Sequence, residues 1–268
     1  MLPAGPANPG IPYVARMDLG ISGRRAAVAA ASGGLGLGAA RALVADGVDV
    51  AICGRDLDRL AGAVAELEAL DGGAVHGLAG DVSTVEGAQA FVVDATEALG
   101  GVDILVPNAG GPPGGGFGDT DLAAYAPALE LSLLSTVAMC QAAVPAMRDQ
   151  RWGRVVAITS VSVRQPIPGL ILSNTARAGV TGFLKTLALE VAADGVTVNS
   201  VQPGSHATDR LRSLHGGDLT AAARSVPTGE LGRPEDFGAV VAFLCSDHAR
   251  FITGAALPVD GGAYRALQ

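Results

Sequence analysis

Hydrophobic residues along the chain fall into short continuous runs that alternate with longer segments of helical period. The runs have strand length and predict strands at 26–30, 48–53, 74–78, 103–107, 155–159, 197–201 and 256–259. Apolar residues at helical spacing predict helices at 36–46, 56–70, 85–99, 124–147, 172–193 and 235–246. Apolar strands separated by helices predict a parallel sheet that is covered on both faces and joined by right-handed crossovers.

The order of these elements predicts an α/β protein with a doubly wound, parallel, seven-stranded sheet in one Rossmann-type domain. No linker or repeat divides the chain, so we expect one dinucleotide-binding domain over 17–268. The first 16 residues lack the charged start and apolar centre of a signal peptide. We expect them to be a disordered leader; a subunit-contact arm and a start-codon choice before Met17 are the alternatives.

Composition narrows the class of partner. A net charge of −8 and a pI near 4.9 argue against nucleic acid and anionic membrane as partners, and no stretch reads as a bilayer span. The cysteines Cys53, Cys140 and Cys245 lie far apart in apolar runs, without metal-ligand spacing. Buried thiols in a reducing cytoplasm, with no metal site, are the expectation.

A glycine-rich turn follows the first predicted strand, where residues 28–38 read VAAASGGLGLG. Glycines at such a turn let backbone amides and the helix N-terminus approach a pyrophosphate closely. Tight packing gives the same composition, but the position between the first strand and the first helix favours a phosphate-binding turn. A second glycine-rich segment at 110–118 follows another strand and is expected to line the same site.

Several segments beyond the turn follow strand ends or close the chain: Asp81-Val82, Asn108-Ala109-Gly110, Pro203-Gly204 with Thr208, and 232–235, 253–254 and 259–262. With the turn, they make residues 23–262 resemble the short-chain dehydrogenase/reductase family, in a divergent branch similar to 3-oxoacyl-[acyl-carrier-protein] reductases. The resemblance implies a nicotinamide dinucleotide held by Ser32, Gly34, Leu35, Gly36, Asp81, Val82, Asn108, Ala109, Gly110, Arg177, Pro203, Gly204 and Thr208. It also implies a homotetramer or homodimer.

The turn departs from the family pattern at its start. Ala29 and Ala30 stand where the family has threonine and its first glycine, whereas Gly34 and Gly36 match the second and third glycines. We expect the methyl group of Ala30 to be tolerated only with a negative φ and open space above it.

The catalytic positions depart further. The family's tetrad of Asn, Ser, Tyr and Lys corresponds here to Ser132, Ser160, Ser173 and Arg177, so only Ser160 is retained. A serine is a weaker acid than a phenol, and arginine does not deprotonate at ordinary pH. The family's relay of protons from tyrosine through lysine is therefore absent.

Ser173 and Arg177 are four residues apart on a predicted helix and share one face. We expect both to face the cofactor cleft, with Arg177 binding ribose hydroxyls or a substrate carboxylate or phosphate. A structural ion pair is the alternative for Arg177. Ser173 and Asn174 serve equally well as helix caps.

Other groups near the cleft offer a proton or a positive charge. His206 lies between Pro203-Gly204 and Thr208, beside the expected nicotinamide, and Arg164 follows Ser160 as a second anion clamp. The alternative for His206 is an exposed histidine with no chemical role, and the alternative for Arg164 is a surface arginine. The tyrosines Tyr13, Tyr125 and Tyr264 and the backbone amides of glycines 114–116 complete the candidates.

The second strand ends in Gly54, where an acidic residue would favour NAD, and Arg55 follows within reach of a 2′-phosphate. NADP(H) is therefore preferred, with NAD(H) as the alternative and a solvated Arg55 beside an Asp56 helix cap as the plain explanation.

Three functions remain open. The first is an NADP(H)-dependent oxidoreductase acting on a carbonyl or alcohol of a small substrate, with an anionic group as one option. The second is a non-redox enzyme on the same scaffold: an isomerase, dehydratase, retro-aldolase or cyclase. The third is a catalytically silent partner subunit.

Overall fold

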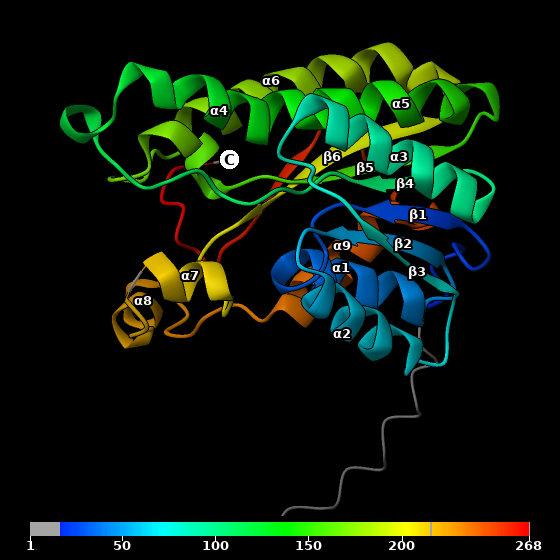
Figure 1. Ribbon diagram of the computed structural model, residues 1–268, viewed down its shortest axis with the longest axis horizontal. Coiled ribbons are helices and arrows are strands. Elements are labelled where there is room, and N and C mark those ends of the chain that lie inside the picture. Colours follow the sequence, from blue (N-terminus) through cyan, green and yellow to red (C-terminus); the bar gives the residue numbers. More distant parts are fainter. Residues whose placement is uncertain (1–16, 215, 268) are drawn as a thin grey trace, which may run out of the picture.

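The computed structural model describes residues 17–214 and 216–267, and the expected leader at 1–16 lies outside them. Its core is one seven-stranded parallel sheet in the order β3-β2-β1-β4-β5-β6-β7 (Figure 1). The strands are β1 (Arg25–Val28), β2 (Asp49–Gly54), β3 (Val75–Ala79), β4 (Ile104–Val106), β5 (Gly153–Ile158), β6 (Val196–Pro203) and β7 (Ala256–Val259). The predicted fold class is confirmed.

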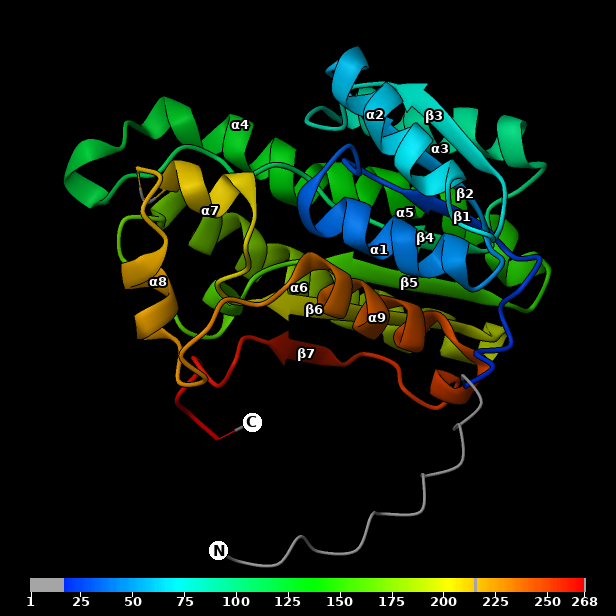
Figure 2. The same cartoon turned by 90° about the horizontal axis from the view of Figure 1, so that it is seen from below.

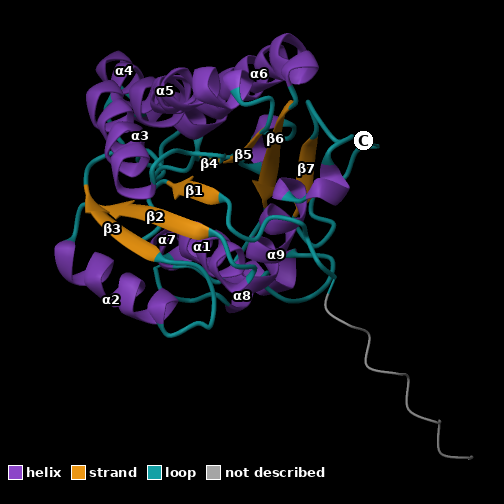
Figure 3. Cartoon of the chain, turned by 90° about the vertical axis from the view of Figure 1, so that its right-hand side faces the viewer, coloured by secondary structure: helices purple, strands orange, loops and turns teal. Residues whose placement is uncertain are grey.

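Helices cover both faces of the sheet, as the buried strands require (Figure 3). The helices are α1 (Gly34–Ala45), α2 (Leu57–Glu68), α3 (Val85–Leu99), α4 (Tyr125–Leu129), α5 (Ser135–Asp149), α6 (Ile171–Val191), α7 (Asp209–Leu214), α8 (Thr220–Ser225) and α9 (Pro234–Cys245). In Figure 1, α3 to α6 lie above the sheet and α1, α2 and α9 below it. Two apolar cores, one on each face, fill the space between the layers.

The helix predicted over 124–147 is interrupted. A π-helical segment, Glu130–Leu134, separates α4 from α5 and places Ser132 in the interior, 3% exposed. Such insertions depend on packing rather than on the apolar period, which continues across them.

One expectation about the membrane is corrected. The helical run Leu122–Asp149 has the length and composition of a bilayer span. Its inner residues, Met139 and Val144 among them, belong to the core on the sheet, and α5 packs against α3. Core packing therefore accounts for the apolar residues on its inner side, while only 33% of its most apolar 18-residue window is buried.

The short helices α7 and α8 were not predicted. Six residues each are too few to show a helical period. They lie beyond the carboxyl ends of the strands, on the side of α4 (Figure 2).

The predicted burial of the thiols is confirmed. Cys53, Cys140 and Cys245 are buried and free. Burial raises the pKa of each thiol to about 12, so they are protonated and unreactive at neutral pH.

Candidate active site

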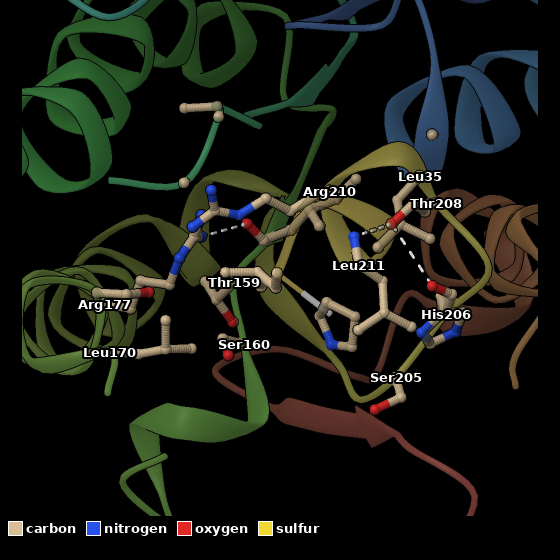
Figure 4. Close-up of a pocket in the computed structure, with 18 of the residues that line it drawn as sticks. Leu35, Thr159, Ser160, Leu170, Arg177, Ser205, His206, Thr208, Arg210 and Leu211 are labelled. Carbon is tan, nitrogen blue, oxygen red and sulfur yellow. Dashed lines mark hydrogen bonds between the residues drawn. The ribbon is translucent and has the colours of Figure 1, made fainter. Parts of the chain in front are cut away.

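A cavity of about 1440 Å³ lies where the strands β1, β4, β5 and β6 end (Figure 4). This is the edge at which an open parallel sheet of this type binds ligands. Segments far apart in the chain line the cavity: 32–35, 55–56, 108–111, 114–115, 158–161, 167–170, 203–206, 208–211 and 263–264, with single residues between them.

The glycine-rich turn forms one end of the cavity. Helix α1 begins after Gly33 with no side-chain cap and no acidic residue in its first turn, so its first amides face the cavity without a protein anion. A Cβ at Gly36 would lie 2.7 Å from the Ala30 carbonyl oxygen and 2.9 Å from Asn108 Nδ2. Gly36 therefore allows α1 to pack closely against the turn, and the uncapped helix N-terminus is the feature that fits a dinucleotide pyrophosphate.

The expectation for Ala30 is wrong. Its φ is +47°, in the left-handed region that favours glycine. Contacts on both sides fix this peptide: the Ala30 amide donates to Cys53 Sγ at 3.3 Å, and its carbonyl accepts from Asn108 Nδ2 at 3.2 Å. The backbone of the turn therefore has the conformation that favours glycine at position 30, although the residue there is alanine.

The tip of β2 carries positive charge beside the turn. Arg55 and Arg59 line the cavity, and Arg55 lies 3.8 Å from Asp81 in an exposed ion pair. Asp56 accepts hydrogen bonds from the amides of Asp58 and Arg59, so its carboxylate caps α2. Gly54 leaves no carboxylate at the strand tip, the arrangement that suits a 2′-phosphate better than a free hydroxyl.

Three of the predicted cofactor residues do not line the cavity. Gly36 lies behind the turn, and Val82 is 5% exposed in the core. Asp81 reaches the cavity only through its ion pair with Arg55. The remaining predicted cofactor residues all line it: Ser32, Gly34, Leu35, Arg55, Asn108, Ala109, Gly110, Arg177, Pro203, Gly204 and Thr208.

The retained serine and two of the three replaced tetrad positions line the cavity together. Ser160 follows β5, and its Oγ accepts from the Ser162 amide at 3.1 Å. Ser173 and Arg177, both on α6, line the same cavity. The α6 N-terminus has no side-chain cap, so the cap alternative for Ser173 is not supported. Asn174 instead holds the preceding loop by hydrogen bonds to Ile167.

Arg177 forms no ion pair within the described part of the chain. Its Nη1 donates to the Ile158 carbonyl at 3.2 Å (Figure 4). Burial, together with the neighbouring charge of Arg210, lowers the pKa of Arg177 to about 10. The guanidinium therefore stays charged at neutral pH, and the structural ion pair considered from sequence is absent among the described residues.

Three predicted site residues have structural surroundings instead. Arg164 lies outside the cavity and donates to the Ala256 carbonyl at 2.6 Å. Ser132 belongs to the π-helical segment and is buried away from the cavity. The Gly115 amide, one of the expected oxyanion donors, is used by the Gly169 carbonyl at 2.7 Å.

His206 reaches the cavity wall but is held as a buried residue, 4% exposed. Its Nδ1 lies 3.2 Å from the Gly204 carbonyl, and its ring packs edge-on against Phe237. Burial lowers the pKa of His206, against the raising effects of Gly204 and of Asp236 and Asp260. A neutral, packed imidazole does not match the proton donor expected beside the nicotinamide.

Sequence reasoning missed two arginines that line the cavity. Arg59 lies over the turn, 2.8 Å from where a Cβ on Gly33 would stand, and pairs with Asp209. Arg210 is on α7 and donates to the Pro112 carbonyl at 2.8 Å. The helical period of 56–70 could have shown Arg59 on the face of Arg55, but α7 gave no periodic signal. Tyr264 also lines the cavity, as the one phenol among the described lining residues.

Comparison with known proteins identifies the class. The sequence profile described as enoyl-(acyl carrier protein) reductase matches residues 29–264. The chain belongs to the short-chain dehydrogenase/reductase family, and it is an oxidoreductase by that membership.

Individual relatives cover nearly the whole chain. It is similar to nodulation protein G of Azospirillum brasilense, with 37% identity over 90% of this chain and 98% of that protein. It is 38% identical to the 3-oxoacyl-[acyl-carrier-protein] reductase of Vibrio cholerae over 70% of this chain and 77% of that one. L-sorbose reductase of Gluconobacter frateurii, solved with NADPH and L-sorbose, superposes with a TM-score of 0.87 at 32% identity and covers 94% of this chain and 100% of that one.

Proposed function

We propose that this protein is an NADP(H)-dependent oxidoreductase that reduces a carbonyl group, or oxidises an alcohol, on a small anionic substrate without a tyrosine–lysine proton relay. One observation carries the proposal. The uncapped N-terminus of α1, Arg55 after β2 with Arg59 in the first turn of α2, and Ser160 with Arg177 all line a single cavity. That cavity is large enough for a dinucleotide together with a small substrate.

The residues that line the cavity fit NADP(H). The turn from Ser32 to Leu35 would hold the pyrophosphate, Arg55 would meet the 2′-phosphate, and Pro203-Gly204 with Thr208 would contact the nicotinamide side. NADPH supplies a hydride when it is bound. NADP(H) complexes among structures similar to this chain support the same preference, with NAD(H) as the weaker alternative.

The chain's own groups act on the substrate oxygen. The Ser160 hydroxyl would donate a hydrogen bond to it, and the positive charge of Arg177 would stabilise negative charge that develops there. With no phenol at position 173 and a packed His206, water would deliver the proton, and the Tyr264 phenol that lines the cavity is the alternative donor. Such a site reduces its substrate more slowly than one with a positioned general acid.

A direct assay tests the proposal. Purified protein with NADPH and a panel of ketones, oxo acids and sugars should consume NADPH, and NADPH should bind more tightly than NADH. Replacing Ser160→Ala should lower kcat at least tenfold, while the NADPH Kd stays within twofold. The matched control is Ser162→Ala, whose hydroxyl does not line the cavity.

The absence of tyrosine and lysine also favours a second candidate, a non-redox enzyme on this scaffold. Turnover of a substrate without NADPH would support that candidate and overturn the first. Absence of both NADPH binding and turnover would leave the silent-subunit hypothesis. We propose a homotetramer or homodimer in the cytoplasm, for which light scattering and cell fractionation are the measurements.

A further inference from the structure

Two arginines from different elements point into the same part of the cavity. Arg177 extends from α6 and Arg210 from α7, and their guanidinium groups approach each other (Figure 4). Their proximity has an electrostatic consequence, since the charge of Arg210 acts on Arg177. Like charges held together in a partly buried site repel each other unless an anion lies between them.

No carboxylate within the described residues neutralises this pair. The other two lining arginines have partners, because Arg55 pairs with Asp81 and Arg59 with Asp209. Among the described residues, the guanidinium groups of Arg177 and Arg210 make one hydrogen bond each, to the carbonyls of Ile158 and Pro112. Since a guanidinium has five N–H donors in a planar fork, most donors of this pair remain for a ligand.

The arginine pair and the retained serine line the same cavity. Arg177 donates to the Ile158 carbonyl, and Ser160 lies two residues further along the same strand end. Arg210 lines this cavity too, so one small ligand can contact the guanidinium pair and Ser160 together.

We propose that Arg177 and Arg210 bind the carboxylate of a small oxo acid, whose carbonyl lies at Ser160. This inference rests on the proposed function and names its substrate class. In the reaction, the carbonyl carbon gains a hydride from NADPH and its oxygen gains a proton from water, giving a hydroxy acid and NADP⁺. The bound carboxylate would also link α7 to α6.

Matched substrates test the proposal. 2-Oxobutyrate and acetoacetate are compared with their methyl esters, which keep the carbonyl and lose the charge. We expect kcat/KM to be at least 100-fold higher for one of the acids than for its ester. Arg210→Gln should lower that acid's kcat/KM at least 30-fold and change the ester's less than threefold. The control Arg212→Gln lies on the same helix but outside the cavity lining and should change neither.

A binding measurement provides a readout without turnover. Oxamate carries a carboxylate next to an amide in place of the ketone, and calorimetry should detect its binding with and without NADPH. Arg210→Gln and Arg177→Gln should each weaken that binding at least tenfold, and Arg210→Lys should restore part of it. Circular dichroism and thermal melting confirm that each variant is folded.

The outcomes separate this proposal from the proposed function. Equal kcat/KM for acids and esters, or oxamate binding that is unchanged in Arg210→Gln, would overturn the oxo-acid assignment while NADPH oxidation stands. If Arg210→Gln and Arg177→Gln weaken only the binding of NADPH, the two arginines bind a phosphate of the cofactor. That result would also overturn the oxo-acid assignment. Oxamate binding that depends on Arg210 in a protein that oxidises no NADPH would retain the carboxylate site and reject the redox function.

Discussion

Ala30 carries a methyl group where the backbone is shaped for glycine. A left-handed φ costs a non-glycine residue about 1–2 kcal/mol, and the φ of Ala30 is +47°. The sequence shows that alanine replaces the family's glycine at this position, but it does not show the sign of φ. That sign depends on the contacts of Ala30 with Cys53 and Asn108, which are distant in the chain.

Ala30→Gly should therefore stabilise the protein. Relief of the left-handed strain exceeds the extra entropy of glycine in the unfolded chain, for a net gain of about 1 kcal/mol. Thermal unfolding should shift upward by about 2–4 °C. The neighbouring Ala29→Gly, at a buried position outside the left-handed region, should lower the melting temperature, and a lower value for Ala30→Gly would contradict the argument.

At the scale of elements, α1 and α9 pack together through glycine. A Cβ on Gly238 would overlap the Gly38 carbonyl oxygen, and a Cβ on Gly38 would overlap the Pro234 carbonyl oxygen. This contact lets α9 lie against α1 on the face of the sheet that faces away from α5 (Figure 3). The periodic pattern predicted both helices but not how closely they approach.

Gly238→Ala should separate these helices and lower the free energy of unfolding by about 3 kcal/mol, through overpacking. Gly62→Ala in α2 is the matched control, since nothing lies within 4 Å of its added Cβ. That control should stabilise the protein by about 1 kcal/mol, because alanine is the better helix former. Urea denaturation measures the free energy of unfolding of both variants. Similar free energies for Gly238→Ala and Gly62→Ala would contradict the close packing of α1 against α9.

Across the whole molecule, the sequence predicted the location of the site better than its contents. The sheet order follows from alternating strands and helices, so the segments at 28–38, 108–110 and 203–208 meet at one edge. Side-chain direction in loops does not follow from such patterns. Arg164 therefore turned out to be structural, and Arg210 was missed.

The opposite end of the sheet joins its two halves through one carboxylate. Asp103, just before β4 and 3% exposed, accepts from the backbone amide and the guanidinium of Arg25 in β1, and from Gln150. Burial alone would raise the pKa of Asp103, but these hydrogen bonds and the charge of Arg25 outweigh it and hold the pKa below its usual range. Ionised Asp103 thus fixes β1 against β4, the two central strands whose other ends form the cavity.

The stability that Asp103 provides depends on pH in a defined direction. Because its folded pKa is depressed, the contribution is complete above the unfolded value near 4 and is lost as pH falls through the folded pKa. Asp103→Asn should lower the free energy of unfolding by about 2 kcal/mol at pH 7, a figure reduced for the partial exposure of Arg25. Urea unfolding between pH 7 and pH 3 should show the gap between wild type and variant narrowing below pH 4. The exposed Asp71→Asn should leave the profile unchanged, and a gap of constant size would show that Asp103 acts through shape rather than charge.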